Sequence, residues 1–171
     1  NGTLKASNYP NLKIMIQNYC DLTLEDVNLD ASEALQCQYV ASNNCGEVEI
    51  IGSTNITAAS GQVAFDVCWW PTSYSEGVQV TINTTGNITG NIELGTYGSL
   101  TGHEISASTL TIEQGTFSGE IEVSTELETQ ATEKISISGG TFTHADVSAY
   151  LVDTVKQDST GQVRPLAAED S

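Results

Sequence analysis

Apolar residues recur at every second position in five short stretches of the chain. In each stretch two apolar residues stand two apart, a step rich in Gly, Thr, Asn or Ser follows, and another large apolar residue ends the pattern. Such alternation predicts strands with one face turned inward. A helical interpretation fails, because β-branched residues and glycines crowd these stretches and no 3.6-residue stripe persists. The five triplets are Leu22/Leu24/Leu29, Val48/Ile50/Ile56, Val80/Ile82/Ile88, Leu110/Ile112/Phe117 and Ile135/Ile137/Phe142.

The stretches form an internal repeat of irregular length. The middle apolar residue recurs at positions 24, 50, 82, 112 and 137, at intervals of 26, 32, 30 and 25 residues. Strands that keep their register while loops vary in length are typical of a solenoid. Second alternating runs follow the first four triplets, namely Leu35/Cys37/Tyr39, Val63/Phe65/Val67, Ile92/Leu94 and Ile121/Val123.

Two or three short strands per repeat predict an all-β chain, a right-handed single-stranded parallel β-helix of about five coils. An antiparallel sandwich is the competing architecture, but it has no reason to repeat its pattern in every coil. The β-helix is expected to span residues 1–157, with a short cap, helical or not, from about residue 145. Residues 158–171 are polar and read as a tail or linker.

Two asparagines stand about one coil apart in similar strings, Asn18 in QNYC and Asn44 in SNNC. Stacked asparagine side chains hydrogen-bond along the axis of in-register ladders. We therefore expect Asn18 and Asn44 to stack at a corner of the coil. The same offset brings Cys20 and Cys45 to nearby rungs.

The charge balance narrows the choice of partners. Five Lys plus Arg stand against 22 Asp plus Glu among 171 residues, a formal net charge of −17. This negative field repels nucleic acids, anionic membrane surfaces and acidic glycans. No stretch approaches the roughly 20 apolar residues of a membrane span, so membrane insertion is not expected.

An aromatic cluster in the string WWPTSY gives the most specific surface signal. Trp69 and Trp70 end an alternating run, so one of them is expected to face outward, near Tyr74 and, one coil on, Tyr97. Exposed aromatic faces stack on sugar rings or fill a protein hot spot. Packing of the indoles against the flank of the core is the other interpretation.

Four cysteines, Cys20, Cys37, Cys45 and Cys68, all fall in the first half of the chain. One or two disulfides and buried free thiols are both consistent with this pattern. A zinc site is not expected, because no CxxC pair is present and both histidines lie far away in the sequence. N-x-S/T sequons begin at Asn1, Asn55, Asn83 and Asn87.

An acidic segment is the weak candidate for a cation site. It lacks the regular nonapeptide of calcium-binding β-rolls, so a solvated face is expected and no metal or cofactor is predicted. Its carboxylates are Asp21, Glu25, Asp26, Asp30 and Glu33.

Catalytic patterns are sparse. Uronate lyases need a high-pKa base, usually Arg or Lys, but the five cationic residues lie mostly near the chain ends. Inverting hydrolysis needs two carboxylates across a groove, and Asp66 is the best-placed candidate. His103 and His144 lie beside predicted turns. Further outward carboxylates are expected at Asp21, Glu49, Glu93 and Glu122.

Several strings point to a family resemblance: NNCGEVEI, VAFDVCWW, VQVTINTTGNITGNIELG, TLTIEQGTFSGEI and ISISGGTFTHADVSAYL. They resemble the GGTF-type right-handed parallel β-helix repeats of secreted and surface proteins from gut-dwelling Gram-positive bacteria. The resemblance covers roughly residues 20–152. It implies display outside the cell or at its surface, with adhesion or scaffolding as the role, and it carries over no catalytic residues.

The sequence thus predicts a non-catalytic extracellular structural or binding module whose partner is a glycan or a protein surface. A self-assembling subunit is the first alternative, with copies stacked end to end into oligomers or filaments, as in phage fibres. A carbohydrate-active lyase or hydrolase is the second alternative and the less favoured one.

Overall fold

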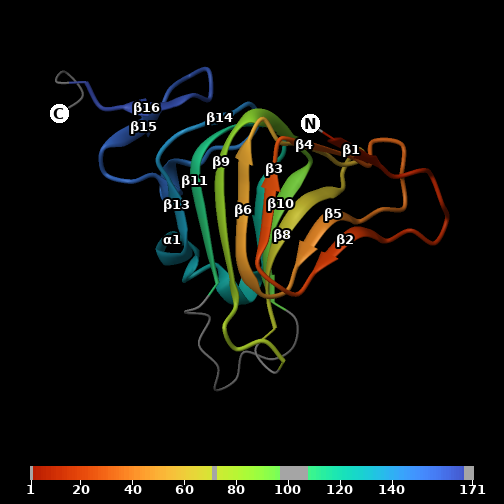
Figure 1. Cartoon of the computed structure of the whole chain (residues 1–171). Helices are drawn as coiled ribbons and strands as arrows, with labels where there is room; N and C mark the ends of the chain where they lie inside the picture. The colour runs from red at the N-terminus through yellow and green to blue at the C-terminus, as the bar shows by residue number, and fades with distance from the viewer. Residues whose placement is uncertain (1, 71–72, 97–107, 168–171) are drawn as a thin grey trace.

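A computed structural model gives the fold and describes residues 2–70, 73–96 and 108–167. The chain winds through about five parallel coils, as the repeat predicts (Figure 1). One wall is a nine-stranded sheet of β1 (Gly2–Lys5), β3 (Leu22–Glu25), β4 (Val27–Asp30), β6 (Gly46–Gly52), β7 (Asn55–Thr57), β9 (Val78–Thr89), β11 (Thr109–Phe117), β13 (Ile135–Ile137) and β14 (Thr141–Phe142).

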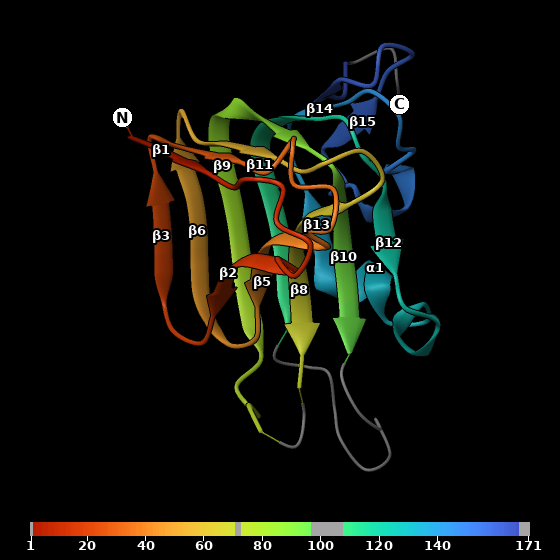
Figure 2. The same ribbon diagram turned by 90° about the vertical axis from the view of Figure 1, so that its right-hand side faces the viewer.

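The opposite wall is a five-stranded sheet with one strand from each coil (Figure 2). In spatial order it runs β2 (Ile14–Asn18), β5 (Tyr39–Asn43), β8 (Val63–Trp69), β10 (Asn91–Thr96) and β12 (Ile121–Val123). A 3₁₀ turn, η1 (Thr125–Leu127), and a single helical turn, α1 (Ala131–Lys134), follow β12.

The predicted triplets form three inward columns. The parallel register places Leu24, Ile50, Ile82, Ile112 and Ile137 directly opposite one another from coil to coil. The first and third members of the triplets align in the same way, and every member except the half-buried Leu22 is buried. Aligned apolar residues bury each other's surface, which stabilises the stack.

One second run differs from the prediction. Leu35 is 58% exposed, and β5 begins only at Tyr39. The amides of Ala34 and Cys37 bond to the carbonyls three residues earlier, so this stretch is a pair of tight turns. The turns bury every third residue, Ala31, Ala34 and Cys37, so the alternation of Leu35, Cys37 and Tyr39 does not correspond to a buried face.

The corner asparagines also differ in detail. Asn18 pairs in register with Asn43, and Asn44 donates from its main-chain and side-chain nitrogens to the Asn18 carbonyl oxygen, at 3.0 and 3.3 Å. Both predicted residues are buried at the corner. Both bonds end on the main-chain carbonyl of Asn18, and no side-chain ladder forms, because Asn43 rather than Asn44 stands opposite Asn18.

The two ends of the solenoid are unlike. Within the described residues, no strand pairs with the outer edge of β2 or β3. The last coil is instead covered by η2 (Ser148–Tyr150) and an antiparallel pair, β15 (Val155–Gln157) and β16 (Val163–Pro165) (Figure 1). Val163 is buried, so residues 158–165, expected in the tail, belong to the cap.

Substituting the centre of the inward column tests the stacking. Ile82 is fully buried between Ile50 and Ile112, so Ile82→Ala is expected to lower the free energy of unfolding by about 3 kcal/mol. The neighbouring Thr81→Ala, on the opposite face of β9, is expected to cost less than about 1 kcal/mol. Equilibrium urea unfolding measures both, and equal losses would contradict the inward assignment of Ile82.

Candidate functional site

A row of polar side chains crosses the outer face of the five-stranded sheet, one from each strand. Register pairs Gln17 with Ser42, and Glu93 with both Asp66 and Glu122. The Ser42 hydroxyl donates to Asp66 and links the two halves of the row at 3.1 Å. Because strand residues alternate between faces, the inward Phe65 and Val67 force Asp66 outward.

Asp66 is the most deeply buried carboxyl of the row, with a side chain only 5% exposed. One carboxyl oxygen accepts from the Asn43 amide and the other from the Ser42 hydroxyl. Burial raises the pKa of Asp66 to about 7 despite these hydrogen bonds, and the charge of Glu93 adds to the rise. Asp66 therefore takes up a proton far more readily than an ordinary aspartate.

Tyr39 reaches across two coils to Glu93. Its hydroxyl lies 3.2 and 3.3 Å from the two Glu93 carboxylate oxygens. Burial is the largest cause of the raised pKa of Glu93, and burial next to Glu93 raises the pKa of Tyr39 to about 12. Tyr39 thus stays a hydrogen-bond donor, and the Tyr39–Glu93 pair spans the strand that carries Asp66.

These groups line a hollow of about 390 Å³. Its lining combines hydrogen-bond acceptors and side-chain amides with an indole, and none of the described residues that line it is Lys, Arg or His. Burial raises the pKa of the Cys68 thiol to about 12, so this sulfur is a poor nucleophile at neutral pH. The lining residues are Ile14, Gln17, Tyr39, Ser42, Asn44, Asp66, Cys68, Trp70, Glu93 and Gly95.

The predicted aromatic cluster is partly assembled beside this hollow. Trp70 is half-buried, and its ring lies 6.0 Å from that of Tyr74 in an edge-on arrangement. Tyr74 in turn lies 5.4 Å from Tyr19, which sequence reasoning missed. Trp69 ends β8, but its side chain lies outside the described residues, as does all of Tyr97.

The acidic segment does not form a single site. Asp21 accepts from the Glu47 amide and Asp26 from Ser53, both on the next coil, whereas Asp30 accepts from Ser32 in its own turn, so the three carboxylates are engaged at separate places. Glu33 is paired with Lys5 at 3.1 Å, and Glu25 is exposed. No group of three potential ligands gathers around a metal position in the described residues.

The carboxylates considered for hydrolysis are divided between the two sheets. Asp66, Glu93 and Glu122 share the outer row, whereas Glu49 lies on the other sheet and accepts from Thr23. His144 is exposed and His103 lies outside the described residues.

All four cysteines are free thiols in the structure. Among the sequons, Asn87 and Asn83 are exposed, Asn55 is half-buried, and Asn1 lies outside the described residues. The Asn83 side-chain amide donates to Glu113 at 2.8 Å.

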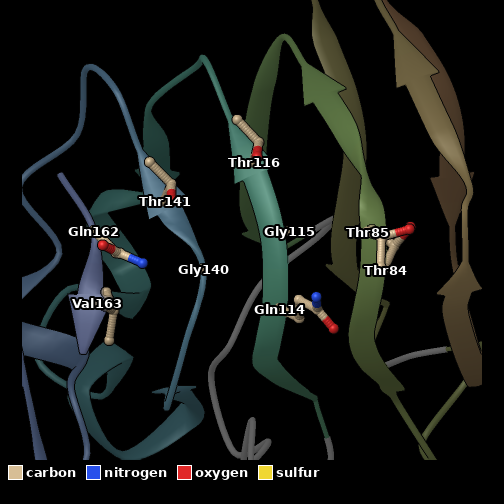
Figure 3. Close-up of a pocket in the computed structure, with 9 residues that line it drawn as sticks. All are labelled: Thr84, Thr85, Gln114, Gly115, Thr116, Gly140, Thr141, Gln162 and Val163. Carbon is tan, nitrogen blue, oxygen red and sulfur yellow. The ribbon is translucent and has the colours of Figure 1, made fainter. Parts of the chain in front are cut away.

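A second hollow, of about 240 Å³, lies at the corner of the last coils. Figure 3 shows Thr116 and Thr141 side by side on neighbouring strands, with Gln162 pointing toward the segment of Gly140. The described residues that line it are uncharged and include no aromatic side chain. It offers hydroxyl and amide groups but no stacking surface.

No protein-family model matches the chain, and neither curated proteins nor solved structures show significant similarity to it. In the part of the chain that the structure describes, no helix is long and apolar enough to cross a bilayer.

The raised pKa of Asp66 predicts an unusual pH dependence. Between pH 4 and 7 the folded protein keeps a proton that the unfolded chain releases, so the free energy of unfolding falls as pH rises through this window. Between pH 4 and 7 the free energy of unfolding of the wild type is expected to fall by on the order of 2–4 kcal/mol more than that of Asp66→Asn. Urea unfolding at several pH values measures the difference.

The exposed Asp153→Asn serves as the control and should keep the wild-type slope. Parallel pH profiles for the wild type and Asp66→Asn would contradict the burial of an Asp66 proton.

Proposed function

We propose that this protein is a non-catalytic extracellular binding module that holds an uncharged glycan in the hollow at Asp66. The main support is that one concave site contains both the Trp70 indole and the hydrogen-bonded Tyr39–Glu93 pair. A volume of about 390 Å³ falls within the range of small-ligand sites. Sugar rings present apolar faces to indoles and hydroxyl donors to carboxylates.

The charge of the hollow selects the class of glycan. Glu93 and Glu122 stand in one row, and the lining residues that the structure describes include no cation to balance a ligand carboxylate or sulfate. The net charge of −17 adds repulsion at longer range. Neutral oligosaccharides are therefore favoured over uronates and sulfated chains.

The same contacts argue against turnover. Both Asp66 oxygens are engaged by Ser42 and Asn43, and the side chain is nearly inaccessible to a glycosidic oxygen. Glu93 is held by Tyr39, and the Cys68 thiol is protonated. Binding uses the acceptors and the ring, whereas hydrolysis needs a carboxylic acid that reaches the substrate.

A glycan array of neutral and acidic oligosaccharides tests this proposal. The wild type is expected to bind neutral members, and Trp70→Ala and Glu93→Gln are each expected to weaken binding about 10-fold or more. Glu49→Gln, an exposed change on the other sheet, should bind like the wild type. No release of reducing ends is expected from the bound oligosaccharides.

With circular dichroism confirming the fold of each variant, unchanged binding by both site variants would refute the assignment of the hollow. Hydrolysis of a bound glycan would refute the non-catalytic role.

The open first coil favours a second function, pairing of two copies through their N-terminal ends. An apolar hollow of about 330 Å³ lies there, lined in part by Leu4, Ile16 and Leu24, and Leu4 is 51% exposed. The β2 and β3 edges beside it offer unpaired main-chain groups to another strand. Because the cap covers the last coil, this pairing ends at a dimer rather than a filament.

Sedimentation velocity over a range of concentrations is expected to show a monomer–dimer equilibrium without larger species. Leu4→Asp should abolish the dimer, whereas Leu166→Asp, at a residue 44% exposed beyond β16, should not. Salt should strengthen the dimer by screening the acidic ends. A monomer at all concentrations, or filaments, would contradict pairing through the first coil.

A further inference from the structure

Two of the four cysteines lie at the same corner of adjacent coils. Cys20 follows β2 and Cys45 follows β5, two strands that pair in register through Asn18 and Asn43. Both cysteines line one open hollow, together with Tyr19, Asp21, Gly46, Glu47, Glu76 and Gln79. Cys20 is exposed and Cys45 is partly exposed, so a reagent in solution reaches this corner.

The register of the flanking strands brings Cys20 and Cys45 to neighbouring positions on adjacent coils. Gly46 lies directly against Cys20, since a Cβ on Gly46 would stand 2.5 Å from the Cys20 carbonyl carbon. Cys45 is therefore offset by one residue from Cys20 on the neighbouring strand. Strands about 4.8 Å apart with a rise of about 3.3 Å per residue put such Cα atoms about 6 Å apart. Disulfides join Cα atoms about 4.4–6.8 Å apart.

The glycine makes this close approach feasible. Gly46 has φ +96°, in the left-handed region, and any side chain there would collide with the Cys20 main chain. The two thiols also interact electrostatically. Burial first, and then the charges of Cys20 and Asp21, raise the pKa of Cys45.

The other two cysteines have different surroundings. Cys37 is fully buried, and its sulfur donates to the Tyr39 carbonyl oxygen at 3.2 Å. Cys68 lies on β8, opposite Gly95, in the hollow of Asp66. Asp66 and Glu93 are the charges that act on Cys68, rather than another thiol.

We propose that Cys20 and Cys45 are a disulfide-forming pair that fastens the first coil to the second under oxidising conditions. The oxidant is a small-molecule disulfide such as oxidised glutathione. The Cys20 thiolate attacks one glutathione sulfur and expels a glutathione thiolate. The Cys45 thiolate then attacks the Cys20 sulfur of the mixed disulfide and expels the second glutathione thiolate. Two electrons and two protons pass from the cysteine pair, so one oxidised glutathione becomes two reduced molecules.

The bond would act where the solenoid is weakest. In the described residues β2 and β3 of the first coil have a partner strand on one side only, whereas β4 pairs with both β1 and β7, so the first coil is held by fewer strand pairings than the inner coils. Closing the chain between residues 20 and 45 restricts the unfolded state. The oxidised protein is expected to melt on the order of 5–10 °C above the reduced protein.

Thiol counting in a glutathione redox buffer tests the pair. After equilibration with oxidised glutathione, alkylation with N-ethylmaleimide in denaturant is expected to label two of the four cysteines of the monomer. Trypsin is unsuitable for mapping, because no Lys or Arg lies between Lys13 and Lys134 and one peptide carries every cysteine. Cleavage after glutamate and tyrosine separates all four and should yield a Cys20–Cys45 linked peptide.

After the same oxidation, the Cys20→Ser and Cys45→Ser variants should each show three thiols labelled by N-ethylmaleimide. Neither variant should show the oxidation-dependent rise in melting temperature. Cys68→Ala, the control, should still lose two thiols on oxidation. Four labelled thiols in the wild type after equilibration, or a linked peptide joining a different pair, would overturn the proposal. Circular dichroism of each variant distinguishes a missing bond from a missing fold.

Discussion

Main-chain hydrogen bonding between neighbouring coils, in a fixed parallel register, is the constraint on which this structure depends. Parallel pairing repeats through both walls, from β3 to β13 and from β2 to β12. It leaves each side chain stacked on its counterpart one coil away. Inside, this stacking aligns Leu24 through Ile137 in one apolar column. Apolar burial then stabilises a register that the hydrogen bonds have already defined.

The same register has the opposite consequence on the outer face, where it brings like charges together. Asp66, Glu93 and Glu122 stand opposite one another because their strands do, although their mutual repulsion opposes that placement. The protein accommodates this by burying Asp66 among donors and by fastening Glu93 to Tyr39. A hollow of acceptors beside an indole results, and it is this chemistry that suits the hydroxyl groups of a neutral sugar.

The inward half of the fold was predictable from the sequence because burial restricts residue type. The period-two triplets identified all three columns, including Phe117 and Phe142, whose rings stack 4.6 Å apart. The outward half was predictable only in part. Alternation indicated that Asp66, Glu93 and Glu122 face outward, but exposed positions tolerate many residues and no pattern links Tyr39 to Glu93 across 54 positions. Residues 158–165 read as a tail because only Val163 is buried there, and their pairing with the last coil depends on contacts that leave no periodic trace.

A crystal structure of the protein with a neutral oligosaccharide selected on the array tests the central claim most directly. A sugar ring is expected against Trp70, with a ring hydroxyl within hydrogen-bond distance of a Glu93 oxygen. A sugar seated instead in the uncharged hollow of Thr116 and Thr141, or at the open first coil, with the hollow at Asp66 empty, would contradict it.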